Sequence, residues 1–164
     1  MARENFSNSP QNLAFWSEIL SEAANDFTKG ALGLDAKQIA IVRQKRAWAA
    51  EIDVLSSDVL DGGNSDAKNL RVRVFADKKH LKKIALILLG EGFDDGALRD
   101  LLGEIVNLIA GRAKVIAGER GVRAAISTPR FVSAAAAVKK EEFLLCFSFA
   151  DGCELAISAL QELK

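Results

Sequence analysis

The chain has 164 residues, of which 49% are apolar, and its 22 Lys and Arg residues are balanced by 22 Asp and Glu residues. A chain of this length and apolar content can bury one sizeable core, so we expect a single domain over residues 1–164, with a loosely ordered segment at 1–12. The balanced charge lacks the basic excess of a dedicated nucleic-acid-binding protein, so no nucleic acid is expected as a partner. The longest strongly apolar run, IALILL at residues 84–89, is far shorter than a membrane span, and we expect a cytoplasmic protein that binds no membrane.

The two cysteines, Cys146 and Cys153, flank a predicted hairpin turn at Asp151-Gly152. A two-residue turn there pairs Cys146 with Ile157 on the neighbouring strand, so the two thiols do not face each other. The chain has one His and no CxxC pair, and therefore neither a disulfide framework nor a zinc site is favoured. We expect reduced cysteines in the core and no metal bound by this chain.

A helix is predicted near the N-terminus, because Ser9-Pro10 has the form of an N-cap followed by proline at the first helical position, and apolar residues then repeat at helical spacing. This helix should cover residues 10–29. Runs of β-forming residues follow it, and then a stretch that is rich in Ser, Asp, Gly and Asn. We expect two adjacent strands and then a loop, at residues 38–44, 47–55 and 56–69.

The loop leads into another predicted strand, over residues 70–75. Val72 and Val74 alternate there with Arg71 and Arg73. This period of two is the pattern of a half-buried strand. The arginines are expected to form a basic face in contact with solvent.

Two helices are predicted next. Asp77 is suited to cap a helix over residues 78–89, and Gly90 is suited to end it. The longest predicted element is a second helix over residues 95–117, with acidic residues at its start and Gly118 just past its end. The predicted fold class is α+β, with helices packed on a largely antiparallel sheet. The remaining strands of that sheet are expected at residues 122–127, 131–138, 141–150 and 153–160.

One face of the 95–117 helix carries a polar stripe. Asp100, Glu104 and Asn107 recur at spacings of four and three, so their side chains lie on the same side of a helix that turns about 100° per residue. The carboxylate and amide groups of the stripe are therefore predicted to face outward. The opposite side is apolar and is expected to be buried; it consists of Leu98, Leu101, Leu102, Ile105, Ile109, Ala113 and Ile116.

Gly103, Gly111 and Lys114 lie close to the centre of this stripe. A glycine inside a helix costs about 1 kcal/mol relative to alanine, so two of them beside Glu104 and Asn107 need an explanation. Close approach of another protein surface is one explanation. The alternative is that the stripe is the ordinary polar face of an amphipathic helix. The glycines favour a binding surface.

The first predicted helix carries a weaker copy of the same pattern. Glu22 and Asn25 repeat the spacing of Glu104 and Asn107, which suggests that the chain is a degenerate tandem repeat. Larger side chains stand in this first copy where the glycines stand in the second, so close docking there would be harder. We therefore expect Glu22 and Asn25 to be structural.

The run from Asp100 to Pro129 resembles the signature of the CheX and CheC family of chemotaxis phosphatases. That signature is Asp or Ser, three residues, Glu, two residues, Asn, and a downstream Pro; this chain reads D-LLG-E-IV-N, then LIAGRAK and later ISTP. The flanking segments LKKIALILLGE and FTKGALG are also similar to those of the family. The departures are a slightly short spacing of 21 residues between Asn107 and Pro129, the replacement of the family's small-residue turn after the proline by Phe131-Val132-Ser133 and an alanine run, and an unusual loop at residues 56–69.

The resemblance implies a CheX-like fold and an enzyme that hydrolyses the aspartyl phosphate of a CheY-like receiver domain in chemotaxis or another two-component pathway. It implies that Asn107 positions the attacking water, that Glu104 anchors the receiver through a cation, and that Asp100 supports orientation at the rim. The receiver would supply Mg²⁺, so the chain needs no cofactor of its own. The surface that binds the partner would also include Gly103, Gly111 and Lys114.

The resemblance also implies a homodimer, because the chain has one convincing motif and CheC-like relatives with two working motifs tend to be monomers. A rival interpretation is a non-catalytic CheX-like module on the same fold, which binds a receiver or a flagellar-switch protein without hydrolysing anything. A small-ligand-binding domain is a third class, but nothing in the sequence predicts the apolar pocket that it needs.

Overall fold

The computed structural model describes residues 13–33, 37–39, 47–57, 69–132, 143–148 and 154–162. No helix within these ranges is long and apolar enough to cross a membrane. In chain order the elements are α1 (Leu13–Gly30), β1 (Lys37–Ile39), β2 (Ala47–Ser57), β3 (Asn69–Asp77), α2 (Lys78–Leu89), α3 (Asp95–Glu119), β4 (Arg123–Ile126), β5 (Arg130–Val132), β6 (Phe143–Ser148) and β7 (Glu154–Glu162).

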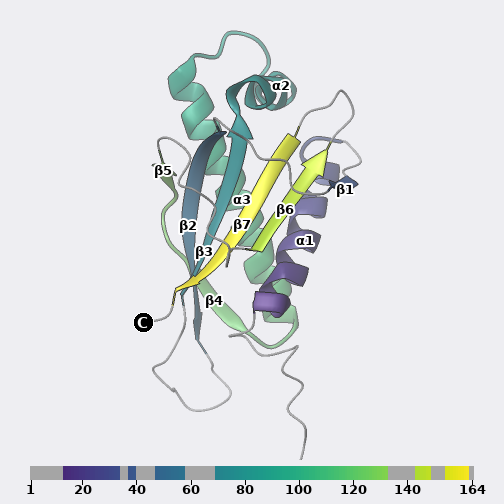
Figure 1. Cartoon of the computed structure of the whole chain (residues 1–164), viewed down its shortest axis with the longest axis vertical. Helices are drawn as coiled ribbons and strands as arrows, with labels where there is room; N and C mark the ends of the chain where they lie inside the picture. The colour runs from purple at the N-terminus through teal and green to yellow at the C-terminus, as the bar shows by residue number, and fades with distance from the viewer. Residues whose placement is uncertain are drawn as a thin grey trace, which may run out of the picture.

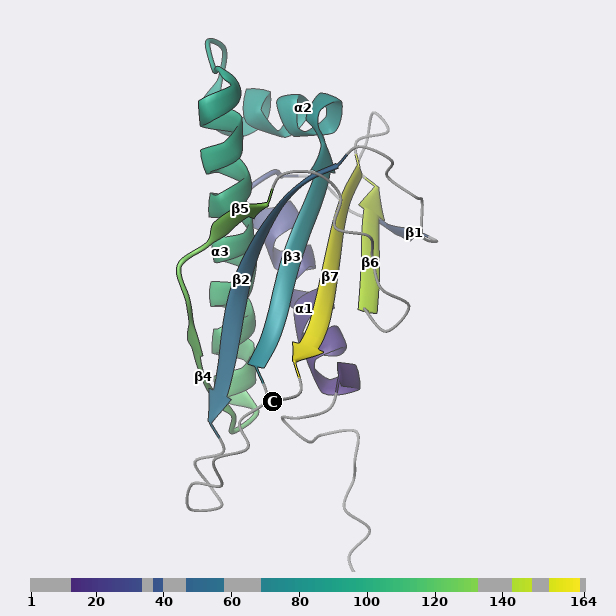
Figure 2. The same cartoon turned by 60° about the vertical axis from the view of Figure 1, so that its left-hand side comes forward.

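The strands form one sheet, and every pairing among the described residues is antiparallel. The sheet order is β1-β6-β7-β3-β2-β4, and β5 pairs with a different stretch of β2 from the one that pairs with β4. Helices α1 and α3 lie on the same face of the sheet, and α2 lies across one of its ends (Figures 1 and 2). The predicted α+β class with a largely antiparallel sheet is confirmed.

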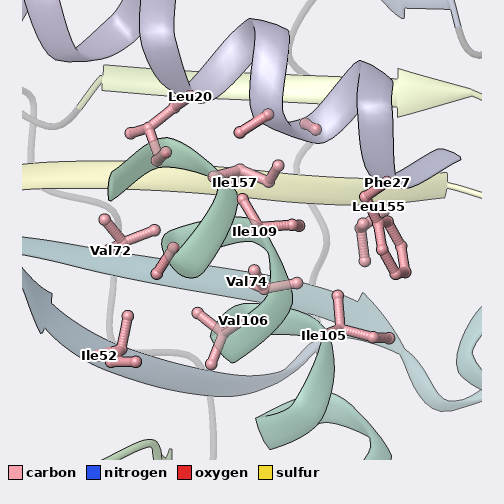
Figure 3. Close-up of a cluster of buried hydrophobic side chains, with 14 of the residues drawn as sticks. Leu20, Phe27, Ile52, Val72, Val74, Ile105, Val106, Ile109, Leu155 and Ile157 are labelled. Carbon is pink, nitrogen blue, oxygen red and sulfur yellow. The ribbon is translucent and has the colours of Figure 1, made fainter. Parts of the chain in front are cut away.

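Buried aliphatic side chains join the helices to the sheet. In β3, Leu70, Val72 and Val74 are buried and alternate with half-buried arginines, as the two-residue period of a strand requires, whereas residues 155–159 of β7 are buried without a break. Each fully buried Val, Leu or Ile side chain stabilises the fold by about 1.5–3 kcal/mol, so one side of α3 is held firmly on the sheet and the other is left outward. Figure 3 shows this core, which includes Ile52, Val72, Val74, Leu155 and Ile157 from the strands, Ile105, Val106 and Ile109 from α3, and Leu20 and Phe27 from α1.

The face of β2 and β3 that points away from the helices carries an ion-pair network. The sequence predicts only a basic face in contact with solvent there. Arg73 Nε donates to Glu51 Oε2 (2.8 Å), and Arg71 Nε donates to Asp53 Oδ1 (3.2 Å). Arg130 Nη2 of β5 lies 3.3 Å from Glu51 Oε1 and 3.1 Å from Asp53 Oδ2. The register of β2 and β3 places these acids opposite the arginines, and alternation within a single strand cannot show that pairing.

Glu51→Gln is expected to lower the free energy of unfolding by about 1.5–3 kcal/mol. Glu51 is only 9% exposed, and hydrogen bonds to a charged group contribute about this much, so two arginines lose a charged partner at once. Chemical denaturation measures the change. Glu104→Gln is the matched control, because it makes the same chemical change at an exposed position and should stay within about 0.5 kcal/mol of wild type. Equal stability of the two variants would show that the network contributes nothing.

The position of β1 differs from the expectation that the strands predicted at 38–44 and 47–55 are adjacent. β1 pairs with β6, so β6, β7 and β3 separate it from β2. Consecutive strands are neighbours only about two thirds of the time, because long-range packing selects the partner. The connection at 40–46, the N-terminal segment expected at 1–12 and residues 58–68 of the predicted loop lie outside the described residues.

The register of the β6–β7 hairpin differs by one residue from the predicted one. Cys146 pairs with Ala156, where a two-residue turn would pair it with Ile157. An Asp-Gly pair is compatible with hairpin loops of several lengths, and a shift of one residue exchanges the two faces of a strand. The connecting residues 149–153, which include the predicted turn, lie outside the described residues.

Helix α2 has the predicted boundaries. The Asp77 side chain accepts a hydrogen bond from Lys79 N (2.9 Å) and so caps the first turn. Gly90 follows the last turn with a φ of 76°, a conformation that favours glycine. Helix α1 ends at Gly30, one residue beyond the predicted end, and residues 10–12 of the predicted helix lie outside the described part of the chain.

Helix α3 is capped at both ends and is slightly longer than predicted. Asp94 Oδ1 accepts a hydrogen bond from a backbone N–H of the first turn (2.8 Å). At the other end Val122 N donates to Ala117 O (2.9 Å). Gly121 N donates to Gly118 O (3.1 Å), which completes a Schellman motif. The glycine that ends the helix is therefore Gly121, at a φ of 84°, and the expectation that Gly118 ends it was wrong.

The strand order has a twofold pattern that bears on the suggested tandem repeat. The elements α1-β1-β2-β3 form one unit, and α3-β4-β6-β7 form a second unit in the same sequence order. If each strand is replaced by its counterpart in the other unit, the sheet order β1-β6-β7-β3-β2-β4 becomes the same order read from the opposite edge. Helix α2 connects the two units, and neither α2 nor β5 has a counterpart among the described residues. This topology is the one that a duplicated unit would give, and duplication of the sequence itself stays a prediction.

Candidate functional site

Ion pairs on the surface connect the α3 region laterally to α1. Arg112 Nε donates to Asp26 Oδ2 (2.6 Å), and this carboxylate raises the pKa of the Arg112 guanidinium. Near the end of α3, Arg120 Nη1 and Nη2 each lie 3.3 Å from an acid of α1, Glu18 and Glu22 respectively. Glu22 thus has a partner within the fold, in keeping with the structural role expected for the first-helix pattern.

The residues predicted for the site all lie on the outward side of α3. The predicted apolar side is buried, and most of its members are fully so. Across the helix from it, the acids of the stripe and the lysine are exposed, whereas the amide and the two glycines are half-buried. The structure thus brings together Asp100, Gly103, Glu104, Asn107, Gly111 and Lys114 on one face.

The polar groups of the stripe are not engaged within the described part of the fold. The side chains of Asp100, Glu104 and Asn107 form no hydrogen bond or ion pair with any described residue. Other acids on the helices, such as Asp26 and Glu22, are paired. An exposed carboxylate and a half-buried amide, one turn apart and unengaged within the described residues, are suited to contact a partner molecule.

The two glycines of the stripe have different surroundings. A Cβ atom at Gly103 would lie 3.7 Å from Pro129 Cβ, an ordinary van der Waals contact. The downstream proline of the motif therefore lies beside the stripe, on the segment between β4 and β5. A Cβ atom at Gly111 would meet nothing within 4 Å, so the fold itself does not require a glycine there.

Gly111→Ala is expected to stabilise the free protein by about 0.4–1 kcal/mol, because alanine is the better helix former and the site is open. The same methyl group should weaken partner binding about fivefold or more if a partner packs against the helix backbone, since overpacking an interface of this kind costs about 1–3 kcal/mol. Thermal unfolding and a binding titration measure the two effects. Gly118→Ala is the matched control, because it is equally open and lies two turns further on. Unchanged binding in both variants would remove the reason for a partner at Gly111.

Two apolar residues on the outward side of α3 were missed by the sequence analysis. Leu108 is 46% exposed and Val115 is 51% exposed. A helical wheel places them about 80° and 60° from Asp100, on the polar side of the helix, and that placement was a signal available in the sequence. Exposed apolar residues are common when single, but these adjoin the stripe and add apolar area to the surface around Glu104 and Asn107.

Among the described residues no group of three or more His, Cys, Asp or Glu side chains is arranged to hold a metal ion. The polar stripe of α3 offers an amide, two carboxylates and an ammonium group. Such groups can orient a water molecule and form ion pairs across an interface. The fold and this face together define an α+β domain with an outward polar helix surface.

No protein-family model and no curated protein matches the sequence. Solved structures match the fold. CheX from Vibrio vulnificus superposes with a TM-score of 0.74 at 18% identity, over 94% of this chain and 99% of that chain. A chain of the CheX–CheY–BeF3–Mg²⁺ complex from Borrelia burgdorferi gives 0.68 at 16% identity, over 90% and 97%. The FliM middle domain from H. pylori gives 0.55 at 11% identity, over 99% and 94%.

The chain therefore has the fold of the CheX and CheC-like chemotaxis proteins, as the resemblance at residues 100–129 implies. At these identities the structural likeness shows the fold. Activity has to be inferred from the residues on α3.

Proposed function

We propose that this chain is a CheX-type phosphatase that hydrolyses the aspartyl phosphate of a phosphorylated CheY-like receiver domain in the cytoplasm. The observation that carries the proposal is the pair Glu104 and Asn107, which lie one turn apart on the outward face of α3 and whose side chains pair with no described residue. The pair occurs in a motif that resembles the CheX signature, on a fold of the same kind. A solved complex of CheX with CheY shows that a protein of this fold type can bind a receiver.

Asn107 is assigned the role of positioning water. Its carbonyl oxygen accepts a hydrogen bond from the water, and its NH₂ group donates to an acceptor of the partner. The water attacks phosphorus in line with the acyl oxygen, the P–O bond to that oxygen breaks, and the aspartate carboxylate and inorganic phosphate are released. A neutral amide suits this position, because a carboxylate would bring a negative charge beside the phosphoryl oxygens.

Glu104 is assigned the role of an anchor. Its exposed carboxylate forms an ion pair with a cation on the receiver, one helical turn from the water at Asn107. This ion pair fixes how the receiver is positioned on α3. Correct orientation of the reacting groups is itself a large part of catalysis. Asp100 supports orientation at the rim, and Gly103, Gly111 and Lys114 form the adjoining contact surface.

The receiver supplies Mg²⁺ and its acidic ligands, so the chain contributes no metal ligand in this proposal. Bound Mg²⁺ neutralises charge that develops on the phosphoryl oxygens. The residues of this chain orient the water, fix the partner and cover the reaction site. The family resemblance further favours a homodimer as the working form.

The test is the decay of a phosphorylated chemotaxis-type receiver with Mg²⁺, measured alone and with this protein. Faster decay with release of inorganic phosphate supports the proposal. The second candidate is a binding module without catalysis, because the FliM middle domain from H. pylori shares this fold and a fold does not by itself imply an activity. A receiver that binds this protein and keeps an unchanged phosphoryl lifetime would identify that second candidate.

A further inference from the structure

A cluster of two aromatic rings and two cations lies beside the first turns of α3. The rings of Trp48 (β2) and Phe131 (β5) meet edge to face, with centroids 5.7 Å apart. Arg99 Cζ of α3 lies 5.7 Å from the Trp48 centroid and 5.3 Å from the Phe131 centroid. Lys78 Nζ of α2 lies 5.4 Å from the Trp48 centroid. We call Arg99, Trp48 and Phe131 the Arg99 clamp.

The two cations of the cluster differ in their charge partners. Lys78 Nζ donates to Asp95 Oδ2 (2.9 Å), and this hydrogen bond holds the pKa of the Asp95 carboxyl below its usual value, with smaller contributions from Lys82 and Arg99. Arg99 itself has no carboxylate within ion-pair distance among the described residues, and its N–H groups donate to none of their oxygens. Its guanidinium is thus held by two rings and keeps its donors for an external acceptor.

The Arg99 clamp is continuous with the proposed docking face. Arg99, Gly103 and Asn107 follow one another at intervals of four residues, so they form one row along the outward side of α3. Gly103 has no side chain, and therefore nothing on this row stands between the guanidinium and the amide. Pro129, which lies beside Gly103, is two residues before Phe131 in the same segment.

The distance along this row decides what Arg99 can bind. Eight residues of helix separate it from Asn107, which is about 12 Å at 1.5 Å per residue. The phosphoryl group lies at Asn107 in the proposed complex, and the Arg99 guanidinium is held against the Trp48 and Phe131 rings. Its ligand is therefore a group at the rim of the partner's phosphorylation site.

We propose that the Arg99 clamp binds a carboxylate at the rim of the receiver's phosphorylation site and so sets the affinity of docking. This inference rests on the proposed function of α3. A guanidinium matches a carboxylate in two parallel hydrogen bonds, and the two rings hold it in place before the partner arrives. Because Arg99 acts away from the reacting atoms, it is a positioning residue for the reaction.

Arg99→Ala is expected to raise the KM for the phosphorylated receiver about tenfold and to leave kcat within twofold of wild type, since the lost contact is equal in the ground state and the transition state. Arg99→Glu should raise the KM further, because it opposes like charges. Increasing salt should weaken docking less in Arg99→Ala than in wild type. Arg112→Ala is the matched control, because Arg112 lies on the same helix and is paired with Asp26.

The dissociation constant is measured in parallel for a receiver that carries BeF3 and Mg²⁺, with BeF3 standing in for the phosphoryl group, together with thermal unfolding of each variant. An Arg99→Ala protein that folds normally and docks as tightly as the Arg112→Ala control would overturn the role of the clamp. If the wild-type protein accelerates decay of the phosphorylated receiver and Arg99→Ala changes neither KM nor the dissociation constant, the clamp proposal fails and the phosphatase proposal stands. If the receiver binds without acceleration, the phosphatase proposal fails, and the dissociation constants still decide the role of Arg99. Receivers that do not bind at all would overturn both.

Discussion

Asn107→Ala is expected to slow the stimulated decay of the phosphorylated receiver by about 10²-fold or more, which is the typical effect of removing one hydrogen-bonding group that acts in a transition state. Asn107 lies half-buried on the outward face of a helix that is capped at both ends and packed on the sheet, so the truncation should not disturb the fold. The loss should appear in kcat at saturating receiver, with little change in KM. The measurement is phosphate release at a series of receiver concentrations.

Asn25→Ala is the matched control for this experiment. Asn25 has the corresponding spacing on α1 and is exposed, so the same truncation is made away from the proposed site. It should leave kcat and KM unchanged. Asn107→Asp should be as slow as Asn107→Ala, because it preserves size and adds a negative charge beside the phosphoryl oxygens. A kcat within twofold of wild type in Asn107→Ala would refute the water-positioning role.

The outward stripe of α3 could be predicted from the sequence because it depends only on residues that are close together in the chain. A period of 3.6 residues decides which side chains share a face, and a helix of 25 residues gives many repeats of that period. The apolar side of the wheel is buried as predicted, and Asp100, Glu104 and Asn107 lie opposite it. Predicting the α+β class required only the order of helical and β-type segments.

The parts of the site that could not be predicted depend on pairing between distant segments. Trp48, Arg99 and Phe131 belong to three elements, and they meet because β2 pairs with β5 next to α3. The contact of Gly103 with Pro129 depends on the same pairing. Strand partners and register are set by long-range packing, which also explains the unexpected position of β1 and the shifted β6–β7 hairpin.

Glu104→Ala is expected to lower kcat/KM by about 30-fold or more, because removing one member of a hydrogen-bonded charge pair at an interface costs about 2–5 kcal/mol. Most of the loss should be an increase in KM, since the anchor is made before the chemical step. Higher ionic strength should weaken the wild-type complex more than the variant complex. Glu119→Ala is the matched control, because Glu119 is exposed at the far end of the same helix and should have no effect.

The two truncations on α3 together distinguish an enzyme from a binding module. In the phosphatase, Asn107→Ala lowers kcat and Glu104→Ala raises KM, because the amide acts on the reacting water and the carboxylate acts on the partner. In a binding module there is no kcat to lose, and both truncations change only the dissociation constant. The double variant adds a second criterion. Two groups with separate roles should have nearly additive effects, whereas Glu104 and Asn107 contacting the same partner group should show a coupling of about 0.5–3 kcal/mol.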